Sequence, residues 1–146
     1  MIATLAGASK VNCVIKFATQ NKLAKLCQIG GLQITHHHPI QVNGKWVYPG
    51  DIVEAKTMTC EAVYNMVVED NHVAIVNEVP VILLGHEYTT GILKNEYLGS
   101  NKVVEDLKQM PGWSEGLIKL NPGCFQKVGK TKRATLVYNG EVGIKI

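Results

Sequence analysis

The chain lacks most of the features that mark secreted and membrane proteins. Its four cysteines have no paired spacing and no Cys-x-x-Cys motif, which argues against a disulfide scaffold. We see no signal peptide at its start, so we expect reduced thiols and a cytoplasmic protein. The longest apolar run, residues 79–84, is far too short to cross a bilayer and is predicted to be a buried strand.

Charged residues are also sparse, at 18% of the chain, and they are unevenly placed. Residues 119–146 contain six Lys or Arg and one Glu and so carry +5, which leaves −2 on residues 1–118 for a net charge of +3. A basic end can contact nucleic acid or an acidic membrane, but a solvated rim is the commoner reason for one. We therefore expect no nucleic acid and no membrane as a partner.

The composition that remains is typical of one all-β domain. The 146 residues can enclose a hydrophobic core, and 14 glycines with many Val, Ile, Thr and Tyr favour strands joined by tight turns. Alternating apolar residues predict a strand over residues 11–17 with Cys13 pointing inward. Further strands are predicted at residues 25–29, 46–48, 60–69, 73–84 and 125–146, with turns at Gly30-Gly31, Asn43-Gly44 and Asn77-Glu78.

Residues 101–110 form the single helix that the pattern predicts. Ser100 is a suitable N-cap, apolar residues three and four apart share one face, and a Pro-Gly pair follows the last turn. The neighbouring carboxylates of Glu105 and Asp106 diverge on such a helix. We interpret them as a solvated face and not as an acid–base pair.

Residues 33–40, Gln-Ile-Thr-His-His-His-Pro-Ile, are the most informative stretch, because three of the five histidines follow one another there. Apolar residues at even spacing predict a strand that enters the stretch with one face buried. Pro39 restricts the residue before it and cannot donate to a ladder, so the strand is expected to bend or stop at this point.

Three interpretations of these histidines stay open on the residues alone. They can be a surface loop without function. They can belong to a zinc site in which His36 and His38 share a third ligand with another part of the chain, such as His72, His86 or Cys60. Alternatively, the hydroxyl of Thr35 and the imidazole of His38 can act together on one peptide bond, the first as a hydrogen-bond donor and the second by moving protons.

The order of the motifs resembles the Hint module, the autoprocessing domain shared by inteins and Hedgehog proteins. It is especially similar to the Hint segment of eukaryotic proteins that also carry a von Willebrand A-type domain. The resemblance covers about nine-tenths of the chain and is weakest over the last fifteen or so residues. The matching pieces are Thr35-x-x-His38-Pro39-Ile40, Gly44-x-Trp46-x-x-Pro49, residues 60–68 with His72, Leu84-Gly85-His86, Tyr97-Leu98-Gly99-Ser100, residues 103–107 and residues 112–116.

This resemblance implies a mechanism in which a first-position Cys or Ser attacks the preceding carbonyl and converts an amide into a thioester. Thr35 would polarise the scissile amide, and His38 would act on its leaving nitrogen. His72 matches the histidine that follows the Val-Tyr-Asn strand of inteins. His86 matches the histidine that assists asparagine cyclisation at the intein C-terminus.

The sequence departs from the family pattern at two positions. It starts with Met1 and not with Cys or Ser, and the usual opening strand is expected to be missing. Glu87 stands where inteins have Asn, so complete splicing is not expected. None of the cysteines lies at a terminus, and buried neutral thiols are their commoner fate.

Together these features predict an all-β, Hint-like barrel that is incomplete at its N-terminus and carries one short helix and a basic β extension. Residues 1–88 would be the β core and residues 89–146 the extension. The expected function is autoprocessing, that is, thioester formation and self-cleavage on the chain's own upstream domain, without cofactor or metal and inactive in the isolated chain. The alternatives are a degenerate barrel that binds a partner or self-associates through a free strand edge beside residues 11–17, and a small zinc-binding domain.

Overall fold

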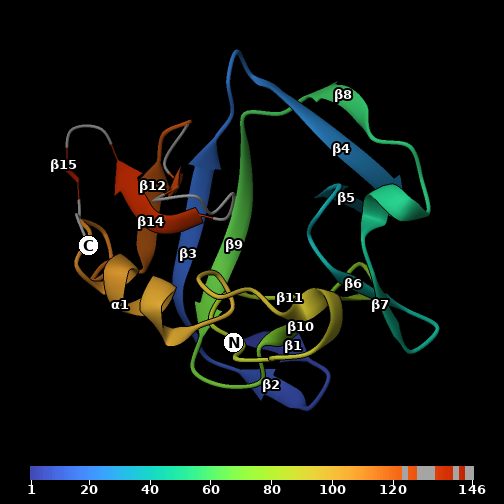
Figure 1. Ribbon diagram of the computed structural model, residues 1–146, viewed down its shortest axis with the longest axis horizontal. Helices are drawn as coiled ribbons and strands as arrows, with labels where there is room; N and C mark the ends of the chain where they lie inside the picture. The colour runs from blue at the N-terminus through green and yellow to red at the C-terminus, as the bar shows by residue number, and fades with distance from the viewer. Residues whose placement is uncertain (123–124, 128–133, 140–141, 144–146) are drawn as a thin grey trace.

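The computed structural model describes residues 1–122, 125–127, 134–139 and 142–143 (Figure 1). Strands dominate it, as the composition predicts, and α1 (Asn101–Lys108) is the α-helix of the described part. Cys124 lies outside the described residues. Within them, no helix is both long and apolar enough to cross a membrane.

A long bent ribbon of two antiparallel strands runs through the molecule. Its first half pairs β3 (Val11–Ala18) with β9 (Ala62–Val68), and its second half pairs β4 (Leu23–Ile29) with β8 (Lys56–Thr59). Figure 1 shows β3 and β9 through the middle of the view, and β4 and β8 leading away from their upper end. Cys13 is fully buried in this ribbon, as predicted.

The bend comes from two additional residues in the first strand. Ala18 pairs with Ala62 and Leu23 pairs with Thr59, so five steps on one strand face three on the other. A tight turn accommodates the two additional residues, and Asn21 in this turn has a positive φ of 56°. Such a local insertion bends and twists a ribbon, and it directs β4 away from β3.

A six-stranded sheet closes the fold below the ribbon. The predicted break at residues 77–78 is confirmed, because both residues have positive φ and turn the chain between two strands. The Asn43-Gly44 turn has the same geometry. The strands of this sheet lie in the order β2 (Gly7–Ser9), β1 (Ile2–Thr4), β10 (Val73–Val76), β11 (Val79–Ile82), β6 (Ile40–Val42) and β7 (Lys45–Val47).

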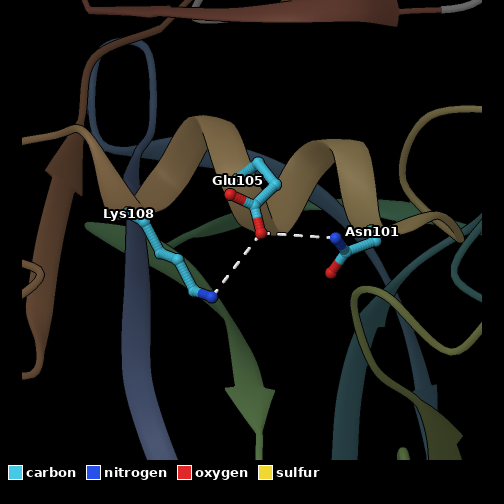
Figure 2. A network of polar contacts seen from close by, with 3 residues as sticks. All are labelled: Asn101, Glu105 and Lys108. Carbon is cyan, nitrogen blue, oxygen red and sulfur yellow. Dashed lines mark hydrogen bonds and ion pairs between the residues drawn. The ribbon is translucent and has the colours of Figure 1, made fainter.

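The predicted helix is confirmed, but one of its two carboxylates was misinterpreted. The Ser100 hydroxyl accepts a hydrogen bond from the Lys102 amide at 3.2 Å, which caps the helix. Glu105 is exposed and its carboxylate contacts its own helix, at 3.6 Å from the Lys108 ammonium and 3.3 Å from the side-chain nitrogen of Asn101 (Figure 2). Asp106, however, is 5% exposed and accepts a hydrogen bond from the hydroxyl of Tyr97. The helix turns this carboxylate toward the core, so it is not part of a solvated face.

The strand edge expected beside residues 11–17 is not free, because β12 (Leu117–Leu120) pairs with β3 in parallel along that edge. Our reason for expecting self-association there is therefore wrong. This pairing joins distant parts of the chain, which no local pattern reveals. The main core lies between this sheet and α1 and includes the buried residues Cys13, Ile15, Val67, Leu84, Tyr97, Val103, Leu107, Ile118 and Leu120.

Strands are confirmed in the described part of the basic end. β13 (Phe125–Lys127), β14 (Ala134–Asn139) and β15 (Val142–Gly143) form an antiparallel sheet. The sequence predicted one or two strands in this region, and the described residues contain three.

Candidate functional site

The Thr35–His38 turn begins where β5 (Leu32–Thr35), the hairpin partner of β4, comes to its end. The carbonyl of Thr35 accepts a hydrogen bond from the amide of His38 at 3.3 Å, which closes a tight turn. Strand β6 starts at Ile40, so the prediction that the strand stops near Pro39 is confirmed. The turn brings the backbone of the predicted pair, Thr35 and His38, together.

A second contact holds this turn from outside. The carbonyl of His36 accepts a hydrogen bond from the amide of Gly50 at 3.0 Å, within the short 3-10 helix η1 (Pro49–Asp51). The ring of His37 stacks on the ring of Tyr48, with centroids 4.7 Å apart. His36 and His37 are both exposed, so of the three consecutive histidines only His38 turns inward.

The carbonyl of Ile82 fixes the ring of His38. Nε2 of His38 lies 2.6 Å from this oxygen, and the amide of Ile82 donates in turn to the carbonyl of Pro39 at 3.2 Å. A carbonyl can only accept, so Nε2 carries a proton and Nδ1 is the nitrogen left for chemistry. Burial lowers the pKa of His38, and the bond to the Ile82 carbonyl opposes part of that shift. At neutral pH the ring is therefore uncharged, with Nδ1 as a free base.

His72 reaches the same region from the loop between β9 and β10. Its carbonyl accepts a hydrogen bond from the amide of Leu83 at 2.9 Å, one residue beyond Ile82. Its Nδ1 is buried and has no hydrogen-bond partner among the residues that the structure describes. A buried polar atom without a partner is costly, and functional sites are one of the places where such atoms are retained.

His86 follows β11 by four residues and is half-buried. Its Nδ1 accepts a hydrogen bond from the amide of Tyr88 at 2.9 Å, so the neutral ring carries its proton on Nε2. Burial, together with charge repulsion from His72, lowers the pKa of His86 to about 4.

The short stretch of residues 82–86 thus collects all three predicted histidines. The ring of His38 is bound to its first residue, the backbone of His72 to its second, and His86 is its last. Thr35 joins them through the turn. The structure places these four residues in one region, while their individual roles stay predictions.

Sequence reasoning missed the groups that hold this site. The carbonyl of Ile82 carries no sequence signal, because any residue could supply it. Gly50 had a weak signal as a glycine after Pro49: a Cβ there would lie 3.1 Å from the Cβ of His36. Gly99 had a similar signal, and its Cβ would lie 2.8 Å from Nε2 of His86.

The zinc interpretation has no ligand set in the described part of the chain. No group of three His, Cys, Asp or Glu side chains there could hold a metal ion. The thiols of Cys13 and Cys27 are fully buried, and burial raises the pKa of both, as suits neutral core residues.

Strands dominate the described fold, and a Thr-x-x-His turn and two further histidines lie near the end of β11. The profile of the family named Vint, described as a Hint domain, matches residues 1–136. The chain therefore belongs to the Hint-domain family. A search of curated proteins finds no match to it.

Proposed function

We propose that this module rearranges a peptide bond of its own polypeptide through a thioester, with Thr35 and His38 acting on the scissile amide. The observation that carries the proposal is the bond between His38 Nε2 and the Ile82 carbonyl, which leaves Nδ1 unprotonated at neutral pH. A histidine held in one tautomer, with a lowered pKa, is in the free-base form at pH 7, so its Nδ1 is available to accept a proton.

The proposed step moves one proton and exchanges one bond. The sulfur of a Cys at the junction attacks the preceding carbonyl carbon, while Nδ1 of His38 takes the thiol proton. The carbon–nitrogen bond then breaks, and the nitrogen leaves as an amine with the proton that His38 returns to it. The hydroxyl of Thr35 donates to the amide carbonyl and stabilises the oxyanion that forms during the attack.

His72 and His86 are proposed to serve the later attack on the thioester. Glu87 follows His86, so asparagine cyclisation has no residue at that position. Among the described residues Nδ1 of His72 has no hydrogen-bond partner, which suits it to remove a proton from the water or amine that resolves the thioester. The Nε2–H of His86 suits a hydrogen bond that holds this nucleophile in place, because Nδ1 already accepts from the Tyr88 amide. Self-cleavage, or transfer of the upstream segment to another nucleophile, would be the outcome.

The test is a fusion in which a reporter domain and a Hint opening strand that begins with Cys are joined ahead of Met1. Incubation with dithiothreitol should release the reporter. Thr35→Ala should slow that release by about two to three powers of ten, because the forming oxyanion loses a donor. His36→Ala is the matched control, since it keeps the Cβ and the carbonyl that contact Gly50. Equal rates for the two variants would refute the assignment of Thr35, and a fusion that never cleaves would refute the proposed function.

A further inference from the structure

The ring of His86 lies against backbone, and the residue it meets is Gly99. A Cβ on Gly99 would come within 2.7 Å of Cε1 and 2.8 Å of Nε2 of His86. It would also come within 2.9 Å of the carbonyl of Asn95. Gly99 does not have the positive φ that makes glycine necessary elsewhere in the fold. The space taken by the imidazole and the carbonyl is therefore what excludes a side chain there.

Two backbone hydrogen bonds bracket His86 on either side of this contact. The amide of Gly85 donates to the carbonyl of Leu98 at 2.9 Å, and the amide of Glu87 donates to the carbonyl of Gly99 at 2.6 Å. Glu87 has a φ of 61°, which a glutamate rarely adopts. Strained backbone of this kind persists only where its surroundings hold it. Through these two hydrogen bonds, residues 95–100 fix the backbone directly before and after His86.

Residues 95–100 are themselves folded tightly. The side-chain oxygen of Asn95 accepts hydrogen bonds from the amides of Tyr97 and Leu98, at 3.0 and 2.8 Å. The amide of Gly99 donates to the carbonyl of Asn95 at 3.2 Å, and the hydroxyl of Ser100 donates to the carbonyl of Tyr97 at 2.8 Å. The segment therefore has one defined shape, which suits it to hold another group in place.

The segment is anchored to the core through Tyr97. This side chain is 2% exposed, and its hydroxyl donates a hydrogen bond to the buried carboxylate of Asp106 on α1. A buried phenol and carboxylate must be paired with each other or with other groups, so this contact sets the depth of Tyr97. A shift of Tyr97 would therefore also move Gly99, which contacts the ring of His86.

We propose that residues 95–100, with Gly99 as the contact residue and the Tyr97–Asp106 pair as the anchor, are a positioning element for the imidazole of His86. The role of His86 in resolving the thioester rests on the proposed function, while its positioning can be measured without any cleavage. The element keeps the ring half-buried with its Nε2 proton beside Gly99. The titratable side chains near His86 include His72, from the loop between β9 and β10, and Tyr88, whose ring stacks on the imidazole with centroids 5.3 Å apart. Gly99 presents only backbone to the ring.

The first test measures the pKa of His86 by NMR titration, with the His86 signal assigned through His86→Gln. Gly99→Ala should push the ring toward water and raise this pKa by at least about one unit, because less burial opposes the charged form less. Gly31→Ala is the matched control: it also lacks a positive φ, and its Cβ would meet Asn77 at an ordinary 3.4 Å. A folded Gly99→Ala protein in which His86 still titrates near 4 would overturn the proposal.

Tyr97→Phe tests the anchor and keeps the proposal decidable if Gly99→Ala does not fold. It removes the hydroxyl that Asp106 accepts from, and a smaller rise in the pKa of His86 is expected. Tyr64→Phe, at a side chain 60% exposed, is its control. If Tyr97→Phe leaves the pKa of His86 unchanged, the Tyr97–Asp106 pair does not help to position His86, and the proposal fails.

A second readout separates this proposal from the function it rests on. In the cleaving fusion, Gly99→Ala should slow spontaneous hydrolysis of the thioester several-fold and leave release by dithiothreitol unchanged, because the added thiol replaces the water that the Nε2–H of His86 would hold in place. Equal slowing of both reactions would contradict a role specific to His86. A parent fusion that never cleaves would refute the proposed function alone, and the titrations would still decide the positioning.

Discussion

His38 and His86 lie beside the same strand end and both have a lowered pKa, yet the fold holds their rings in different ways. The strand-built side of the site fixes His38 with a hydrogen bond from its ring to the Ile82 carbonyl. The side of the site formed by residues 95–100 adds a steric contact at His86, with Gly99 against its ring and backbone hydrogen bonds on both flanks. A hydrogen bond sets the tautomer of each ring, from the Tyr88 amide in His86 and to the Ile82 carbonyl in His38, while the contact with Gly99 sets the position of His86. The comparison shows that one site can combine a hydrogen bond to a ring nitrogen with a close backbone contact to hold its histidines.

The largest effect on the cleavage rate should come from removing the imidazole of His38 in the cleaving fusion. His38→Ala should slow release by dithiothreitol by about two to three powers of ten, because the leaving nitrogen loses its proton source. His86→Ala should leave the same reaction nearly unchanged, since the added thiol bypasses the later step. Band intensities on a gel over time measure both rates. Equal losses in the two variants would show that the histidines do not divide the work.

The stability of the part of the fold around α1 should depend on Asp106 and not on the adjacent Glu105. Asp106→Ala leaves the buried Tyr97 hydroxyl without this acceptor and should lower the free energy of unfolding by about 1–3 kcal/mol. Glu105→Ala removes an exposed ion pair with Lys108 and an exposed hydrogen bond from Asn101, and it should cost less than about 0.5 kcal/mol. Urea unfolding followed by circular dichroism gives both values. A larger loss for Glu105→Ala would contradict the placement of the anchor.

Both sides of the site should weaken the fold in acid. The folded pKa of His86 is about 4, below its ordinary 6.5, so the unfolded chain binds the proton more readily. The stability is therefore fully present above pH 6.5 and is lost as the pH falls toward 4, and His38 adds in the same direction. His86→Gln should reduce the loss between pH 7 and 4.5 by about 1–2 kcal/mol, allowing for the ring's partial exposure. Urea unfolding at the two pH values checks this, and an equal loss in the variant would contradict it.

The smallest effect concerns the hairpin that presents Ile82 to His38. Glu78 lies in its turn with a φ of 68°, a conformation that glycine adopts without strain. Glu78→Gly should therefore raise the free energy of unfolding by about 0.5–1 kcal/mol. Thermal unfolding measures the change, and Glu78→Ala, which keeps a Cβ, is the control. A gain of equal size in the alanine variant would show that the backbone strain is not the cause.

The sequence by itself determined the elements whose signals are local. The pairs Asn43-Gly44 and Asn77-Glu78 mark hairpin turns, Ser100 caps the helix, and Pro39 marks the break between two strands. Each of these signals depends on the conformational limits of a few neighbouring residues, so it can be interpreted without knowing the rest of the chain. The order of the motifs likewise indicated the Hint family and the four candidate residues.

Only the tertiary structure decided what those residues contact. The pairing of β12 with β3, the burial of Asp106, the carbonyl beside His38 and the backbone beside His86 each join parts of the chain distant in sequence or turn a side chain to one of two faces. A carbonyl or a missing Cβ has no residue type of its own by which it could be recognised. Their effect on the two histidines arises because the packed fold excludes water and leaves each ring a single place to lie.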